Sequence, residues 1–210
     1  TLLDSEKLWD VALADLATRL GGTLSPAARH AITGTDAATT MRIFYRDLGL
    51  DHRLTDPALA AADQAYLNAR VADLFTTDLT WRPGAAALLA EVRAAGVPTA
   101  LVTSTPRHLT TLALRTLGAD NFDTVICGDE VTHPKPHPEA YATAAARLGV
   151  PAHRCVAIED SPAGAAAALA AGTTVLAVPN GHDLSHLTGL RLATSLTDVD
   201  LGYLTALVDH

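Results

Sequence analysis

The first 76 residues show a hydrophobic pattern with the period of an α-helix and none of the alternation typical of strands. Leu8, Ala12 and Leu16 lie one helical turn apart, and two further helices follow the Ser-Pro start at 25–26 and the Asp-Pro start at 56–57. This segment is therefore predicted to be all helical. The expected helices are 6–20, 25–33, 37–48 and 57–76.

The pattern changes after "RPG" at 82–84, where short β-rich runs begin to alternate with helical ones. The expected helices are 84–95, 106–117, 138–148, 162–171 and one near 200–208. The expected strands are 98–102, 124–127, 155–158, 174–178 and a short one near "RLAT" at 191–194. Such alternation predicts an α/β fold in which helices cover both faces of a parallel sheet.

Composition and charge narrow the classes of protein that fit. With 210 residues, 49% of them hydrophobic, the chain can bury a sizeable core in one large or two small domains. Its formal net charge of -8 repels nucleic-acid backbones and anionic lipid, so neither a nucleic-acid partner nor a membrane-surface role is expected. A small anionic substrate would need locally placed positive charge.

The cysteines and the apolar segments favour a cytoplasmic protein. Cys127 and Cys155 lie in apolar runs without paired spacing and are predicted to be buried free thiols. The most apolar helical run, "AAALLAEVRAAG", contains Glu91 and Arg93, and no charged-then-apolar leader is present. Neither export nor a membrane span is therefore expected.

Polar side chains that suit phosphate and metal chemistry follow three of the predicted strands. Thr103 and Ser104 follow "TALV", Lys135 lies in "HPKPHPEAY", and Glu159 with Asp160 follows "VAI". Because the carboxyl ends of parallel strands meet at one edge of a sheet, these groups are expected to converge there.

Each group also has a simpler interpretation. Residues 103–105 could cap the next helix, Lys135 could be a solvated loop lysine, and Glu159 with Asp160 could be acidic residues at a helix start. The flanking prolines nevertheless restrict the Lys135 backbone, and adjacent carboxylates suit a hard cation such as magnesium.

His133 and His137 have the spacing of metal ligands on one face of a helix. The prolines at 134, 136 and 138 are incompatible with a helix there, so the sequence does not favour a metal role for this pair.

"LVTST", "HPKPHPEAY" and "AIEDSPAGAAAALAAG" resemble the second, third and fourth motifs of the haloacid dehalogenase superfamily, in the branch of small-molecule phosphatases and β-phosphoglucomutase. The resemblance implies a Rossmann-like parallel-sheet core at 1–9 and 79–210 with an inserted all-helical cap domain at 10–78. The family's first motif is Asp-x-Asp-Gly-Thr, commonly followed by "LLDSE"; here only Thr1 and "LLDSE" correspond to it.

The resemblance also implies roles for the strand-end residues. Thr103 and the backbone N–H of Ser104 would bind the transferring phosphoryl group, and Lys135 would neutralise its charge. Asp160 would ligate Mg²⁺, and Glu159 would do so directly or through water. The nucleophilic aspartate and the acid–base aspartate would precede Thr1.

The missing first motif affects the fold as well as the chemistry. In this family its strand lies at the centre of the sheet, between the strand that ends at Thr103 and the one that ends at Glu159. Without it two strand edges lack partners, so we expect roughly 5–15 further residues upstream in the natural protein.

The function that the resemblance implies is Mg²⁺-dependent hydrolysis of a small phosphorylated metabolite through an aspartyl phosphate, by a monomer or weak dimer. A sugar phosphomutase is an alternative, although the histidine and arginine expected for it near Trp9 and Ala37 are absent. A non-catalytic binding protein fits if Thr1 is the natural start. A haloacid dehalogenase is disfavoured because its metal-free chemistry has no use for Glu159 beside Asp160.

Overall fold

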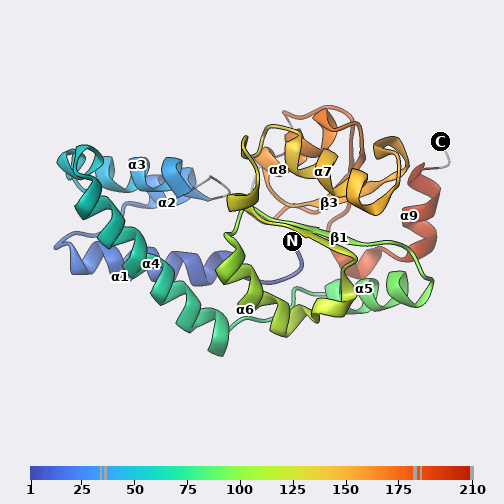
Figure 1. Ribbon diagram of the computed structural model, residues 1–210, viewed down its shortest axis with the longest axis horizontal. Helices are drawn as coiled ribbons and strands as arrows, with labels where there is room; N and C mark the ends of the chain where they lie inside the picture. Colours follow the sequence, from blue (N-terminus) through green and yellow to red (C-terminus); the bar gives the residue numbers. More distant parts are fainter. Residues whose placement is uncertain (34, 36, 182–183, 185, 209–210) are drawn as a thin grey trace. The chain divides into compact units, whose positions relative to one another are not determined.

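The computed structural model describes all residues except 34, 36, 182–183, 185 and 209–210, and it divides the chain into two compact units (Figure 1). The core unit comprises Thr1–Leu3 and Trp81–His210, and the helical unit comprises Asp4–Thr80. The chain passes from the core unit to the helical unit after Leu3, whereas the predicted boundary followed residue 9. The boundary is earlier because α1 is one continuous helix that starts at Glu6. Residues 209–210, which the predicted core includes, lie outside the described residues.

The described part of the helical unit consists of helices and their connections, as the sequence predicts. These are α1 (Glu6–Arg19), α2 (Pro26–Ile32), α3 (Ala37–Asp47), the 3-10 helix η1 (Asp51–Thr55) and α4 (Pro57–Thr77). Ser25 and Asp56, each followed by a proline, cap α2 and α4. The Ser25 side chain accepts one backbone N–H of the first turn, and the Asp56 side chain accepts two. In the described part of the chain, no helix is both long and apolar enough to cross a membrane.

The core unit alternates helices with short strands. Its α-helices are α5 (Ala85–Ala94), α6 (Arg107–Leu117), α7 (Glu139–Leu148), α8 (Pro162–Ala170) and α9 (Leu201–Val208). Its strands are β1 (Ala100–Val102), β2 (Thr124–Ile126), β3 (Val156–Glu159), β4 (Thr174–Ala177) and β5 (Leu190–Leu192). Short 3-10 helices, which the sequence did not predict, are η2 (Ala119–Asn121), η3 (Gly128–Glu130), η4 (Ala152–Arg154) and η5 (Leu196–Asp198).

The five strands form two parallel sheets instead of one. β1 pairs with β2 in the first sheet, and β3, β4 and β5 pair in that order in the second. Among the described residues, β1 and β3 each leave one edge without a strand partner. These are the two edges between which the family resemblance places an upstream strand.

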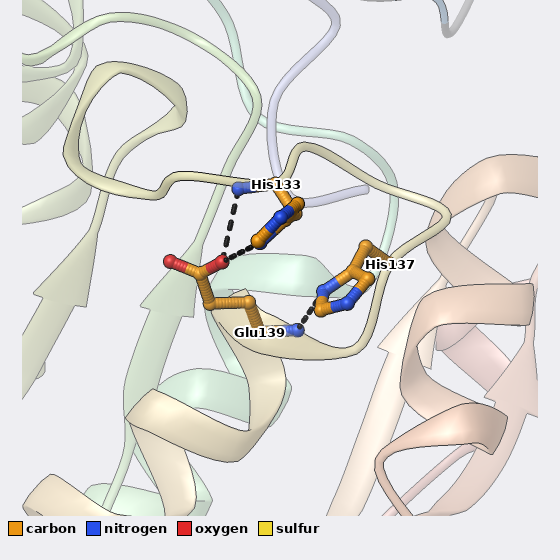
Figure 2. Close-up of side chains that lie close together, drawn as sticks. All are labelled: His133, His137 and Glu139. Atoms are coloured by element: carbon orange, nitrogen blue, oxygen red, sulfur yellow. Dashed lines mark hydrogen bonds and ion pairs between the residues drawn. The ribbon is translucent and has the colours of Figure 1, made fainter.

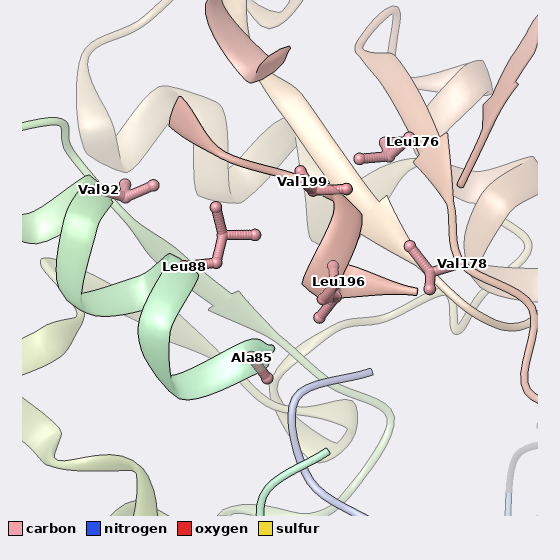
Figure 3. Close-up of a cluster of buried hydrophobic side chains, with 7 residues drawn as sticks. All are labelled: Ala85, Leu88, Val92, Leu176, Val178, Leu196 and Val199. Carbon is pink, nitrogen blue, oxygen red and sulfur yellow. The ribbon is translucent and has the colours of Figure 1, made fainter. Parts of the chain in front are cut away.

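Helices cover both faces of the second sheet because its side chains alternate. On one face, Leu176 and Val178 lie near residues of α5 and η5 (Figure 3). On the other face, Ala157 and Val175 pack with alanines of α8. The cluster drawn in Figure 3 consists of Ala85, Leu88, Val92, Leu176, Val178, Leu196 and Val199. This two-sided burial is what the apolar strand runs predicted.

Both cysteines are free thiols, as the sequence predicts. Cys127 is buried, whereas Cys155 is only partly buried. The prediction of full burial was therefore wrong for Cys155, which lies in the connection between η4 and β3 rather than inside a strand.

Candidate functional site

Lys135 joins the ends of two strands that belong to different sheets. Its Nζ donates hydrogen bonds to the Val102 carbonyl at 3.2 Å and to Oε1 of Glu159 at 2.7 Å. Val102 is the last residue of β1 and Glu159 the last of β3. The structure thus brings the predicted lysine and one predicted carboxylate into contact at the carboxyl ends of the strands.

Both oxygens of the buried Glu159 carboxylate have hydrogen-bond partners. Oε1 accepts hydrogen bonds from Lys135 and from the hydroxyl of Tyr141. Oε2 accepts from the backbone N–H of Asp160 at 3.1 Å and from the N–H and hydroxyl of Ser161 at 3.3 and 3.1 Å. The side chain is 5% exposed, so these contacts compensate the loss of water around the carboxylate.

Gly164, in the first turn of α8, provides the space for this carboxylate. A Cβ atom at Gly164 would lie 2.0 Å from Oε1 of Glu159 and 2.2 Å from Oε2. The Ser161 hydroxyl also accepts the Gly164 N–H at 3.1 Å, which caps the helix directly beside the carboxylate. The "SPAG" sequence therefore packs a helix start against Glu159.

The charges and hydrogen bonds in this cluster keep Glu159 ionised and Tyr141 protonated. Burial by itself would raise the pKa of Glu159, but the ammonium of Lys135 and the hydrogen bond from Tyr141 outweigh it and hold that pKa below its usual value. Burial and the neighbouring Glu159 charge raise the pKa of Tyr141 well above its usual value. Near neutral pH, Glu159 is thus a carboxylate and Tyr141 a protonated hydrogen-bond donor.

Tyr141 is a site residue that the sequence analysis did not identify. Besides its bond to Glu159, its hydroxyl accepts from Lys135 at 3.3 Å, and the Lys135 Nζ lies 4.9 Å from the centre of its ring. It lies on α7 among buried alanines, where a tyrosine requires a partner for its hydroxyl. A tyrosine hydroxyl on a helix face that otherwise consists of alanines was the signal in the sequence that could have identified it.

Asp160 lies at the same strand end but is more accessible than Glu159. Its Oδ1 accepts the Thr1 hydroxyl at 2.8 Å, and its Oδ2 lies 3.1 Å from the Thr1 amino group. Arg82 and Asn180, which the sequence did not indicate, each approach Oδ2 at 3.5 Å. Burial raises the pKa of Asp160, whereas the hydrogen bond from the Thr1 hydroxyl and the charge of Arg82 act to lower it.

The donor set at this strand end fits a hard cation through Asp160. Its carboxylate is 15% exposed and its contacts with Arg82 and Asn180 are long, so water and an ion can reach its oxygens. Glu159 is less accessible, because its side chain is only 5% exposed. Direct or water-mediated ligation by Glu159 stays a prediction.

Thr103 lies immediately after β1, next to the residue that Lys135 contacts. Its backbone N–H donates to the Ile126 carbonyl at 3.0 Å, and its hydroxyl accepts the Thr105 N–H at 3.1 Å. The hydroxyl does not cap α6, whose N-cap is Pro106 without a side-chain bond. The interpretation of residues 103–105 as the cap of this helix was therefore wrong, and the role of Thr103 in binding phosphate stays a prediction.

Ser104 is exposed in the bend between β1 and α6. Gly128 lies so close to it that a Cβ atom there would be 2.1 Å from the Ser104 carbonyl oxygen. The Gly128 N–H also donates to the Thr105 carbonyl at 3.2 Å. The connections after β1 and β2 therefore pack together, and the backbone of Ser104 lies at the strand end where its phosphate role is predicted.

Sequence comparisons identify the family to which this geometry belongs. The profile of the haloacid dehalogenase-like hydrolases matches residues 1–172. Hexitol phosphatase A of Escherichia coli is 32% identical over 196 residues, which cover 91% of this chain and 85% of that protein. Validoxylamine A 7'-phosphate phosphatase of Streptomyces hygroscopicus subsp. limoneus is 33% identical over 188 residues, covering 89% of this chain and 85% of the relative.

The fold is also similar to that of a solved structure. CbbY from Rhodobacter sphaeroides, crystallised as a variant in complex with xylulose-(1,5)bisphosphate, superposes with a TM-score of 0.82 at 28% sequence identity. The match covers 97% of this chain and 94% of that structure. Both the helical and the core unit therefore have counterparts in one solved fold.

Proposed function

This chain belongs to the haloacid dehalogenase-like hydrolases, and on that basis we propose that it is a Mg²⁺-dependent phosphatase of a small phosphorylated metabolite. The observation that supports this most strongly is the buried contact of Lys135 with Glu159 at 2.7 Å, beside Asp160 at the strand ends. This contact supports a role for Lys135 as a fixed positive charge, close in the fold to Asp160, the carboxylate that we propose holds the cation. A phosphate monoester requires both kinds of charge compensation.

Each strand-end residue has a role in this proposal. Lys135, the Thr103 hydroxyl and the backbone N–H of Ser104 bind the phosphoryl oxygens, while Glu159 and Tyr141 position the lysine. Asp160 holds Mg²⁺. The ion supplies additional positive charge that offsets the charge on the phosphate and the attacking carboxylate.

We further propose that the nucleophile is an aspartate on a strand upstream of Thr1. The unpaired edges of β1 and β3 support this, because a parallel strand between them would end beside Lys135, which contacts the last residues of both strands. The contact of Thr1 with Asp160 places the start of the described chain at this strand end. The carboxylate attacks phosphorus as the bond to the ester oxygen breaks, and the upstream acid–base aspartate gives its proton to the departing alcohol. The same aspartate then takes a proton from the water that hydrolyses the aspartyl phosphate, which releases inorganic phosphate.

The substrate class proposed is the phosphate ester of a polyhydroxylated metabolite such as a sugar or sugar alcohol. The two curated relatives are named for a hexitol and for validoxylamine A 7'-phosphate, and the similar CbbY structure holds a sugar bisphosphate. In the family resemblance the inserted helices form the cap, so we expect selectivity among such esters to depend on side chains of the helical unit.

The test uses the natural protein with its upstream residues. Phosphate release from a panel of sugar and polyol phosphates should require Mg²⁺, and Asp160→Asn should lower kcat by orders of magnitude with an unchanged fold. Glu91→Gln, which changes an exposed carboxylate on α5, should retain activity. Turnover in chelator contradicts the metal assignment, and isomerisation of the sugar phosphate without phosphate release indicates a mutase.

The upstream nucleophile has its own test. A polypeptide of residues 1–210 should release no phosphate, whereas the protein with its upstream segment should be active. Turnover by the shorter chain that Asp160→Asn abolishes would place the nucleophile among the residues described here, and this part of the proposal would be wrong.

A further inference from the structure

The loop that carries Lys135 brings three metal-ligating groups together on the surface. The His133 and His137 rings lie 4.5 Å apart between centroids, with 31° between their planes. Glu139, at the start of α7, has a carboxylate oxygen 2.8 Å from Nδ1 of His133. Figure 2 shows the two rings on the loop and the Glu139 side chain beside them on the first turn of the helix.

This convergence does not need the helix that the sequence argument required. Prolines at 134, 136 and 138 do exclude a helix through the two histidines. The loop that they form nevertheless turns the His133 ring towards the Glu139 carboxylate and the His137 ring towards the Glu139 backbone N–H (Figure 2). One ligand atom from each of the three residues lies within 4.8 Å of the others. The sequence correctly excluded a helix through His133 and His137, but it did not indicate that a loop could bring the two rings and Glu139 together.

The carboxylate is fixed before any ion binds. Oε1 of Glu139 accepts the Thr132 N–H at 2.7 Å, and Oε2 accepts the His133 N–H at 2.9 Å. The prolines restrict the backbone between His133 and Glu139 further. Both histidines are exposed, so an ion can reach them from solvent. A site that is restricted in this way loses less conformational entropy on binding.

We propose that His133, His137 and Glu139 bind a divalent transition-metal ion, of which Zn²⁺ is the representative, on the surface of the Lys135 loop. Two imidazoles and one carboxylate suit Zn²⁺, Co²⁺, Ni²⁺ or Cu²⁺, whereas Mg²⁺ prefers oxygen ligands. The ligands of this site therefore differ in chemistry from the carboxylate that Asp160 offers to Mg²⁺.

The geometry needs only a small adjustment. Zinc bonds of about 2.0–2.1 Å place tetrahedral ligand atoms about 3.4 Å apart. The His133 nitrogen and the Glu139 oxygen are already closer than this, at 2.8 Å. The widest separation, which is at most 4.8 Å, can close by side-chain rotation because both histidines are exposed. Water completes the coordination.

The position of the site gives it a consequence for the loop. Lys135 lies between the two histidines in sequence, and its Nζ reaches Glu159 and the end of β1. An ion that joins His133 and His137 would link the two ends of the segment that presents this lysine. Occupancy should therefore restrict the movement of the loop.

The test measures binding directly with Co²⁺ and Zn²⁺. The full-length protein is first saturated with Mg²⁺ to occupy the carboxylate site, and is then titrated with Co²⁺ while its visible absorption is recorded. Wild type should bind one Co²⁺ that Zn²⁺ displaces. His133→Ala, His137→Ala and Glu139→Gln should each weaken binding by more than about tenfold. His153→Ala, an exposed histidine of η4, should have no effect.

Thermal unfolding provides a second measurement of metal binding in case a substitution also alters the stability of the protein. Zn²⁺ should raise the thermal midpoint of wild type and of His153→Ala, and should not raise that of His133→Ala. Asp160→Asn should still bind Co²⁺. Unchanged affinity in the histidine variants, absence of binding in wild type, or loss of binding in Asp160→Asn would each overturn the proposal. None of these results bears on phosphate hydrolysis, so the two proposals fail separately.

Discussion

Each unit of the molecule contains a buried carboxylate that is bonded by a tyrosine hydroxyl and by a cationic side chain. In the helical unit, Asp63 accepts hydrogen bonds from Tyr45 at 2.9 Å and Arg53 at 2.6 Å. In the core unit, Glu159 accepts from Tyr141 and from Lys135. Asp63 and Glu159 are 5% and 4% exposed, so the two sets are alike in chemistry and burial.

Their surroundings differ, and this difference separates a structural set from the one that we propose is functional. Asp63 lies inside α4 and joins it to α3 through Tyr45 and to η1 through Arg53. Glu159 instead lies at a strand end, followed directly by the accessible Asp160. A buried acid with a cation and a tyrosine is therefore no evidence for catalysis until a reactive neighbour lies beside it.

Asp63→Ala should produce the largest loss of stability and leave the chemistry intact. The substitution removes the carboxylate that pairs with the Arg53 guanidinium. Arg53 Nε is already the one buried polar side-chain atom without a hydrogen-bond partner among the described residues. We expect unfolding of the helical unit to become easier by about 3–5 kcal/mol. In a Trp81→Phe background, the fluorescence of Trp9, which packs edge-on against Phe75, reports this unit.

The contrast between the two sets depends on the activity of that variant. At a temperature where Asp63→Ala is folded, its kcat should match that of wild type. A fall in kcat without a loss of stability would mean that Asp63 acts in the reaction, and the two carboxylates would then not differ in kind.

Lys135→Ala is the corresponding change of the cation in the core unit, and Arg53→Ala is its matched control. Because the lysine charge acts as the phosphoryl group moves, Lys135→Ala should lower kcat by about 10²–10³-fold. Arg53→Ala should reduce stability and leave kcat of the folded enzyme unchanged. If Lys135→Ala raises only KM, the lysine merely attracts the substrate and its proposed role is wrong.

Local pattern was sufficient to predict most of the helices and strands. The α4 prediction of 57–76 compares with Pro57–Thr77, and the β3 prediction of 155–158 with Val156–Glu159. Both depend on signals within a few residues, namely a proline start and a short apolar run. The 3-10 helices were missed because three to five residues are too few to show a period.

Contacts between distant residues could not be predicted in this way. Lys135 and Glu159 emerged as candidates because strand ends collect functional groups, but nothing in the spacing indicated that they touch. Tyr141 reaches Glu159 across 18 residues, and Arg82 reaches Asp160 across 78. Such pairs depend on how helices pack on strands, which the hydrophobic pattern does not specify.

Gly164→Ala should have an intermediate effect, confined to the core unit. Helix propensity alone would favour alanine by about 1 kcal/mol. The added Cβ, however, would lie 2.0 Å from a Glu159 oxygen, so the carboxylate or the start of α8 must move. We expect a net loss of about 1–3 kcal/mol in a denaturant titration, together with reduced kcat. A variant more stable than wild type would show that the Glu159 position is not tightly restricted.

The smallest effects, and the sharpest comparison, come from removing one hydroxyl in each unit. Tyr45→Phe and Tyr141→Phe each delete a donor to a buried carboxylate that keeps its cation. Each should reduce the free energy of unfolding by about 0.5–1.5 kcal/mol. Only Tyr141→Phe should also lower kcat, by about two- to tenfold, because the Lys135 ammonium loses a contact that positions it. Equal kcat for both variants would reduce Tyr141 to a structural residue like Tyr45, and the core-unit set would then owe its function to Lys135 and Asp160 alone.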